Sequence, residues 1–117
     1  MANVAMILKR SPYGDINAAE AVRHALGAVS FDMNVDLILV DGGVLLAKKG
    51  QEDSGTGFTN LEGALKDCLE MGVTVYADID SLKAQGVTSN DLADNVKRVG
   101  AKEIAGLVKE AETTMIF

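Results

Sequence analysis

Short, almost uninterrupted apolar segments recur along the chain and constrain its fold more than any other feature. Residues 3–8 and 35–40 are each too continuously apolar to form a strand with one face in water, and residues 73–77 predict a third strand. Segments of this kind are typical of strands that are buried on both faces of a parallel sheet. Residues 113–117 predict a further strand, and residues 96–99 are a candidate for a fifth.

Helical periodicity fills the intervals between these segments. Apolar residues recur at three- and four-residue steps over residues 16–29, 61–69 and 101–111. Alternation of strands and helices favours right-handed crossovers and an open sheet. We therefore predict one α/β domain spanning residues 1–117, with a mostly parallel sheet of four to five strands and helices on both faces, in a three-layer arrangement like the Rossmann and flavodoxin folds.

The ends of the helices are marked less clearly than their centres. Asn34 is expected to close the first helix in a left-handed conformation, and Gly72 is expected to end the second. Two further short helices are expected at residues 81–84 and 90–96.

Charge and composition exclude several classes of function. Seventeen acidic residues outnumber 11 basic ones and give a net charge of −6, so the surface repels a phosphate backbone and direct nucleic-acid binding is not expected. A single cysteine cannot form an internal disulfide, and no segment approaches the roughly 18 apolar residues of a membrane span. We expect a cytoplasmic protein without membrane contact.

Ligands of open parallel sheets bind outside the carboxyl ends of the strands, so three loops are of interest. These loops contain the candidate ligand or partner pocket, which consists of Arg10, Ser11, Tyr13, Asp41, Gly42, Gly43, Asp78, Asp80 and Ser81. The three aspartates could converge on a magnesium ion, but aspartate and serine also commonly end strands and cap helices. No phosphate-binding motif is present, and we predict neither a cofactor nor a resident metal.

Two side chains have both a chemical and a structural interpretation. Cys68 could carry sulfur as a persulfide if it were exposed and its pKa were lowered. It lies, however, on the apolar stripe of its helix with Ala64 and Leu65, which favours a buried, inert thiol. His24 has no second histidine or cysteine at ligand spacing and has Glu20 one turn before it, which favours a solvated helix face over a catalytic base.

Four segments form a joint pattern over nearly the whole chain. They are Arg-Ser-Pro-Tyr-Gly at 10–14 before a helix with Ala-Ala-Glu at 18–20, Asp-Gly-Gly-Val at 41–44, Gly-Val-Thr-Val-Tyr at 72–76 leading into 81–87, and Ile-Phe at 116–117. In order and spacing these segments resemble the DsrE/DsrF-like family of small sulfur-relay proteins. The segment at 10–14 is most similar to the DsrF/TusC-type subunits.

This resemblance implies a cytoplasmic protein that forms trimers or hexamers, alone or with related subunits. Such proteins pass persulfide sulfur between sulfur-carrier proteins during sulfur oxidation or tRNA thiolation. Sulfur-carrying members of the family have a reactive cysteine at the end of the third strand or in the loop after it. This chain has Ala-Asp-Ile-Asp at 77–80 instead, and Cys68 belongs to the preceding helix.

The departure from the family pattern leaves three hypotheses for the function. The first is a non-catalytic or partner-docking member of a sulfur relay, because acidic groups at Asp78 and Asp80 disfavour a nearby thiolate. The second is a genuine sulfurtransferase that uses Cys68 after a local rearrangement. The third is a small-ligand or metal-binding module at the strand ends, using Arg10, Asp41, Asp78 and Asp80.

Overall fold

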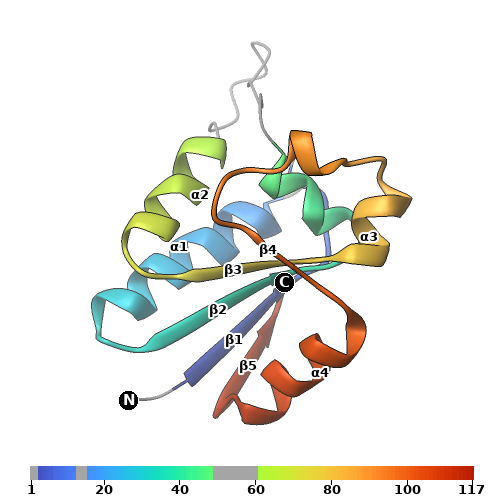
Figure 1. Ribbon diagram of the computed structural model, residues 1–117. Helices are drawn as coiled ribbons and strands as arrows, with labels where there is room; N and C mark the ends of the chain where they lie inside the picture. Colours follow the sequence, from blue (N-terminus) through green and yellow to red (C-terminus); the bar gives the residue numbers. More distant parts are fainter. Residues whose placement is uncertain (1–2, 13–15, 49–60) are drawn as a thin grey trace.

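The computed structural model describes residues 3–12, 16–48 and 61–117, which contain a five-stranded parallel sheet (Figure 1). Its strand order is β4-β3-β2-β1-β5, and every neighbouring pair is parallel. The strands are β1 (Asn3–Leu8), β2 (Asn34–Leu39), β3 (Thr74–Asp78), β4 (Lys97–Val99) and β5 (Thr113–Ile116). The predicted α/β class and open parallel sheet are confirmed, with all five strands parallel.

Helices cover both faces of this sheet, as predicted. The α-helices are α1 (Asn17–Ser30), α2 (Leu61–Glu70), α3 (Ile79–Ala84) and α4 (Ala101–Glu110), and the 3-10 segments are η1 (Asp41–Ala47) and η2 (Ser89–Asp91). From β1 to β4 each strand is added on the same side of the previous one, so right-handed connections place α1 and α2 on one face. The connection from β4 to β5 runs back across the sheet, and α4 therefore lies on the other face (Figure 1).

The larger core lies between the sheet and the two helices α1 and α2, and we call this side the α1–α2 face. Alternate residues of the strands point into it, because successive side chains of a strand face opposite ways. The most deeply buried side chains of this core are Met6, Leu8, Leu37, Leu39, Leu65, Val75 and Cys68. The apolar segments predicted from the sequence are therefore removed from water in this core.

The opposite side, the α4 face, is covered more thinly. Ala5, Ile38 and Val99 are buried but do not belong to the larger core. No residue of α4 itself is buried, and its apolar residues Ile104 and Leu107 are only half-buried. The apolar side chains of the strands are therefore buried on the α1–α2 face and only partly covered on the α4 face.

Two local predictions are wrong, and both errors concern backbone geometry. Asn34 does not end the first helix, because it begins β2 and the left-handed residue is Asp32, with φ 61°. The helix expected at 90–96 is absent from the described residues, since Leu92 forms an antiparallel bridge with Lys48 instead. Gly72 does adopt the positive φ expected at the end of the second helix, 100°.

Within residues 3–12, 16–48 and 61–117, no helix is long and apolar enough to cross a membrane.

Candidate functional site

The carboxyl ends of β1, β2 and β3 are brought together by close backbone packing, and we call this edge of the sheet the rim. The segment that leaves β2 at Gly42 and Gly43 lies directly against the segment that leaves β1. A Cβ atom at Gly43 would overlap the carbonyl oxygen of Leu8, and one at Gly42 would lie 3.1 Å from the backbone nitrogen of Ser11. The two predicted glycines therefore allow the two backbone segments to lie close together.

Ser81 connects two of the rim loops through a short hydrogen-bond chain. Its hydroxyl donates to Oδ2 of Asp78 over 2.6 Å and accepts a bond from the backbone N–H of Asp41 over 2.8 Å. The backbone N–H of Ser81 also donates to Asp78 Oδ2, over 3.1 Å. Asp78 is the N-cap of α3, so its carboxylate holds the start of that helix.

This arrangement gives most of the predicted rim residues a structural role or an exposed position. Ser81 is buried with 7% exposure, whereas Arg10, Asp41 and Asp80 are exposed and Ser11 is half-buried. Tyr13 lies outside the described residues.

The aspartates of the rim do not form a cation site in the described part of the chain. No group of three or more acidic, histidine or cysteine side chains there is placed to hold a metal ion. The carboxylate of Asp78 is already occupied by Ser81. The structure does not bring the three predicted aspartates together as a magnesium site.

Cys68 lies away from the rim, on the side of α2 that packs into the core. Its side chain has no exposed surface, and its Sγ atom is 3.9 Å from the carbonyl oxygen of Val22 on α1. Burial, with a smaller contribution from the charge of Asp67, raises the pKa of the Cys68 thiol to about 11. Both effects disfavour the thiolate, which is the nucleophilic form.

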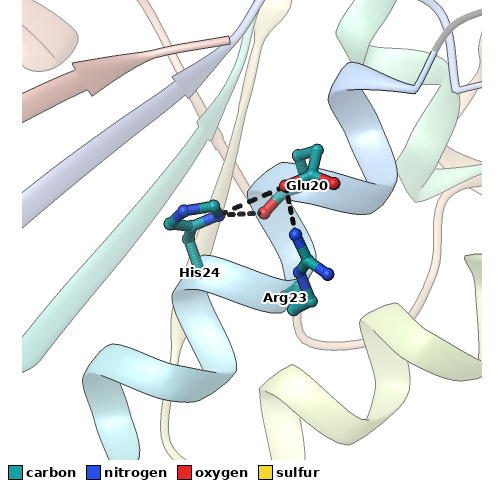
Figure 2. A network of polar contacts seen from close by, with 3 residues as sticks. All are labelled: Glu20, Arg23 and His24. Atoms are coloured by element: carbon teal, nitrogen blue, oxygen red, sulfur yellow. Dashed lines mark hydrogen bonds and ion pairs between the residues drawn. The ribbon is translucent and has the colours of Figure 1, made fainter.

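His24 belongs to a small polar cluster on the surface of α1 (Figure 2). Arg23 donates to Oε2 of Glu20 over 2.6 Å, and His24 Nδ1 lies 2.7 Å from the carbonyl oxygen of Glu20. The His24 ring also lies 5.5 Å from the ring of Phe117. Because the Arg23 and His24 side chains are 74% and 43% exposed, the cluster is a largely solvated helix surface that stabilises the fold little.

A cavity beside the rim contains functional candidates that the sequence analysis missed. It lies between α3, η2 and β4, has a volume of about 440 Å³, and carries Lys83 and Arg98 in its lining. We call it the cation-rimmed cavity. Lys83 and Arg98 are fifteen residues apart and come from different elements, so no local motif indicates that they share a site.

Comparison of the sequence with known families and proteins gives consistent matches. Residues 2–117 match the model of the DsrE/DsrF-like family. The chain is 31% identical over 112 residues to the protein MJ0989 of Methanocaldococcus jannaschii, covering 96% of each. It is 34% identical over 87 residues to the intracellular sulfur oxidation protein DsrF of Allochromatium vinosum, covering 74% of this chain and 64% of that protein.

The fold also matches solved structures. The YchN protein of E. coli superposes with a TM-score of 0.91 over the full length of both chains, at 21% identity. The protein MTH1491 of Methanobacterium thermoautotrophicum superposes with a TM-score of 0.76, also over the full length of both, at 17% identity. At these identities the structures support the fold alone.

Proposed function

This chain belongs to the DsrE/DsrF-like family, as its sequence pattern predicted, and we propose that it is a partner-docking member of a cytoplasmic sulfur relay. In this proposal the chain does not itself carry persulfide sulfur. It joins related subunits or sulfur-carrier proteins that bear the reactive thiol. Membership of a family of the sulfur-oxidation and relay type supports a role in a sulfur relay. The position of the cysteine supports partner docking rather than sulfur transfer.

The position of the one cysteine carries the proposal. Cys68 is buried in the core on α2 and does not belong to the rim. The end of β3 and the residues after it are Ala77, Asp78, Ile79 and Asp80, none of which can form a persulfide. Cys68 is fully buried, and its raised pKa keeps the thiol protonated near neutral pH. A sulfur donor would therefore meet no accessible thiolate.

A sulfur-loading experiment tests this proposal. The folded protein is treated with inorganic polysulfide near neutral pH and analysed by mass spectrometry without a reducing agent. We expect no added sulfur on the folded chain, and addition to Cys68 when the same treatment is made in urea. Stoichiometric loading of the folded protein would contradict the proposal and favour a sulfurtransferase that uses Cys68.

Exposed apolar side chains support the assembly that we propose, as a homo-oligomer of trimer or hexamer type or with related subunits. The most exposed large ones are Phe31, Ile16, Ile116 and Met71, with 80%, 68%, 66% and 51% of their surfaces accessible. A contact between subunits that covered these side chains would remove apolar surface from water. Light scattering is expected to detect oligomers, and a purely monomeric protein throughout the micromolar range would contradict self-assembly.

We further propose that the exposed residues of the rim contribute to partner docking. Arg10, Asp41 and Asp80 are accessible at the edge where ligands of parallel sheets commonly bind. Their neighbours Gly42, Gly43, Asp78 and Ser81 hold the loops in place through the contacts described above. The rim thus presents charged groups on a fixed backbone.

A further inference from the structure

The lining of the cation-rimmed cavity has an aliphatic part, which we call the floor, and a polar part, which we call the walls. Four aliphatic residues form the floor, namely Ile79, Leu82, Val87 and Leu92. Leu82, Val87 and Leu92 are each at least 92% buried, whereas Ile79 is 36% exposed. An aliphatic group that entered the cavity would therefore contact the floor and leave water.

Local hydrogen bonds hold the lining of the cavity in place. After α3 the chain turns at Gly86, which has φ 70°, and the backbone N–H of Val87 donates to the carbonyl oxygen of Leu82 over 2.9 Å. The hydroxyl of Thr88 donates to Asp91 over 3.0 Å and closes the start of η2. The cavity is thus formed before any ligand arrives, which reduces the entropy lost on binding.

The polar groups of the walls are arranged as hydrogen-bond donors. Arg98 Nη1 donates to the Ser89 hydroxyl oxygen over 2.7 Å, so that the hydroxyl proton and the other guanidinium N–H groups are available to a ligand. Lys83, which carries an ammonium group, also lines the cavity. Among the described residues, neither Lys83 nor Arg98 forms an ion pair with an acidic side chain.

The charge of this cavity is opposite to the net charge of the chain. No acidic residue lines it in the described part of the chain, although acidic residues outnumber basic ones by 17 to 11 in the sequence. Two other cavities differ in this respect, because Glu70 and Asp94 line the one beside α2 and Asp36 and Glu110 line the one beside β2. A ligand of this cavity is therefore expected to be anionic.

We infer that the cation-rimmed cavity binds a peptide segment of a partner protein in which a carboxylate side chain lies next to an aliphatic one. The carboxylate contacts Arg98 and Lys83, and the aliphatic side chain packs on the floor beside Ile79. This inference rests on the proposed docking function, because a relay subunit without its own thiol acts through protein partners. A small inorganic anion would leave the apolar floor unused.

Fluorescence anisotropy tests the inference with a defined probe. The probe is a fluorescein-labelled peptide of alternating glutamate and leucine, with neutral ends, and the comparison peptide replaces each glutamate with glutamine. The whole protein is expected to bind the glutamate peptide and to bind the glutamine peptide at least about tenfold more weakly, because only a carboxylate forms charge-assisted bonds with the cations.

Single substitutions then locate the binding site. Arg98→Ala and Lys83→Ala are each expected to weaken binding of the glutamate peptide about fivefold to tenfold. Lys102→Ala and Lys109→Ala remove the same charge from exposed positions on α4 and are expected to leave the affinity unchanged. Ile79→Ser removes part of the floor at a partly exposed position and is expected to weaken both peptides.

Three outcomes would overturn the inference. Equal binding of both peptides would exclude recognition of a carboxylate, and equal effects of the α4 lysine variants would assign the binding to net charge alone. Displacement by free N-acetylglutamate at the concentration at which the peptide competes would exclude a peptide ligand. No sulfur chemistry enters this assay, so its failure is distinguishable from failure of the sulfur-loading experiment.

Discussion

The two faces of the sheet are made from the same five strands and yet differ in almost every physical respect. On the α1–α2 face, Met6, Leu37 and Leu39 have 1% exposure or less, and the single cysteine is enclosed with them. On the α4 face no helix residue is buried, and Ile116 of the edge strand is 66% exposed. The α1–α2 face therefore contributes most of the buried apolar core, and the α4 face contributes less.

The polar residues of the two faces differ as well. On the α4 face, burial raises the pKa of Asp36, and the charge of Lys97 opposes this shift. Burial and the charge of Asp36 raise the pKa of Tyr76, whose ring centroid lies 5.9 Å from the Lys97 Nζ atom. Among the described residues, no charged side chain is buried on the α1–α2 face. Charge is tolerated only where the sheet is thinly covered.

The largest expected effect is a difference in core stability between the two faces. Leu37→Ala on the α1–α2 face should lower the free energy of unfolding by about 2–5 kcal/mol, because it leaves a cavity in a fully buried site. Ile104→Ala on α4 should lower it by less than about 1.5 kcal/mol, because that side chain is only half-buried. Urea unfolding measures both, and equal losses would contradict the asymmetry.

A smaller effect concerns the dependence of stability on pH. The thiol of Cys68 has a pKa of about 11 when folded, against 9.0 as its ordinary value, so the unfolded chain loses this proton first. Its contribution is therefore constant below pH 9 and is lost as the pH rises from 9 to 11, by roughly 2 kcal/mol.

The Cys68→Ala variant is the control for this pH effect. It should be less stable at every pH because it leaves a cavity, but it should lack the part of the alkaline decline that Cys68 causes. Other groups titrate equally in both proteins. Parallel stability curves between pH 9 and 11 would show that the thiol is not buried in solution.

The smallest effect is expected on the exposed sides of the helices. Gly106→Ala in α4 and Gly27→Ala in α1 should each raise the free energy of unfolding by about 0.5–1 kcal/mol, since an added Cβ meets no atom within 4 Å at either position. Gly43→Ala should do the opposite because its Cβ would overlap the Leu8 carbonyl oxygen. Thermal unfolding compares the three variants, and a destabilised Gly106→Ala would contradict the open space around Gly106.

The sequence predicted those features that depend on periodicity. Burial requires apolar residues at regular positions in the sequence. For this reason the strands β1, β2 and β3 and the apolar stripe that contains Cys68 could be predicted. The parallel topology also predicted that the loops at Asp41 and Ser81 meet at one edge, and a hydrogen bond of 2.8 Å connects them.

Features that depend on contacts between distant segments could not be predicted in this way. The helix expected at 90–96 is replaced by a bridge between Lys48 and Leu92, which are far apart in sequence. The tertiary structure likewise brings Arg98 of β4 to the cavity that Lys83 of α3 also lines. Neither pairing leaves a local pattern, because the two partners lie in different segments of the chain.

Titration of the thiol with a chromogenic disulfide tests most directly whether this chain can carry sulfur. Cys68, the only cysteine of the sequence, is inaccessible and protonated in the folded protein. Near neutral pH the folded chain should react at least about a hundredfold more slowly than the urea-unfolded chain, because burial blocks access and raises the pKa of the thiol from 9.0 to about 11. Reaction of the folded chain as fast as the unfolded one would contradict the burial and protonation of Cys68.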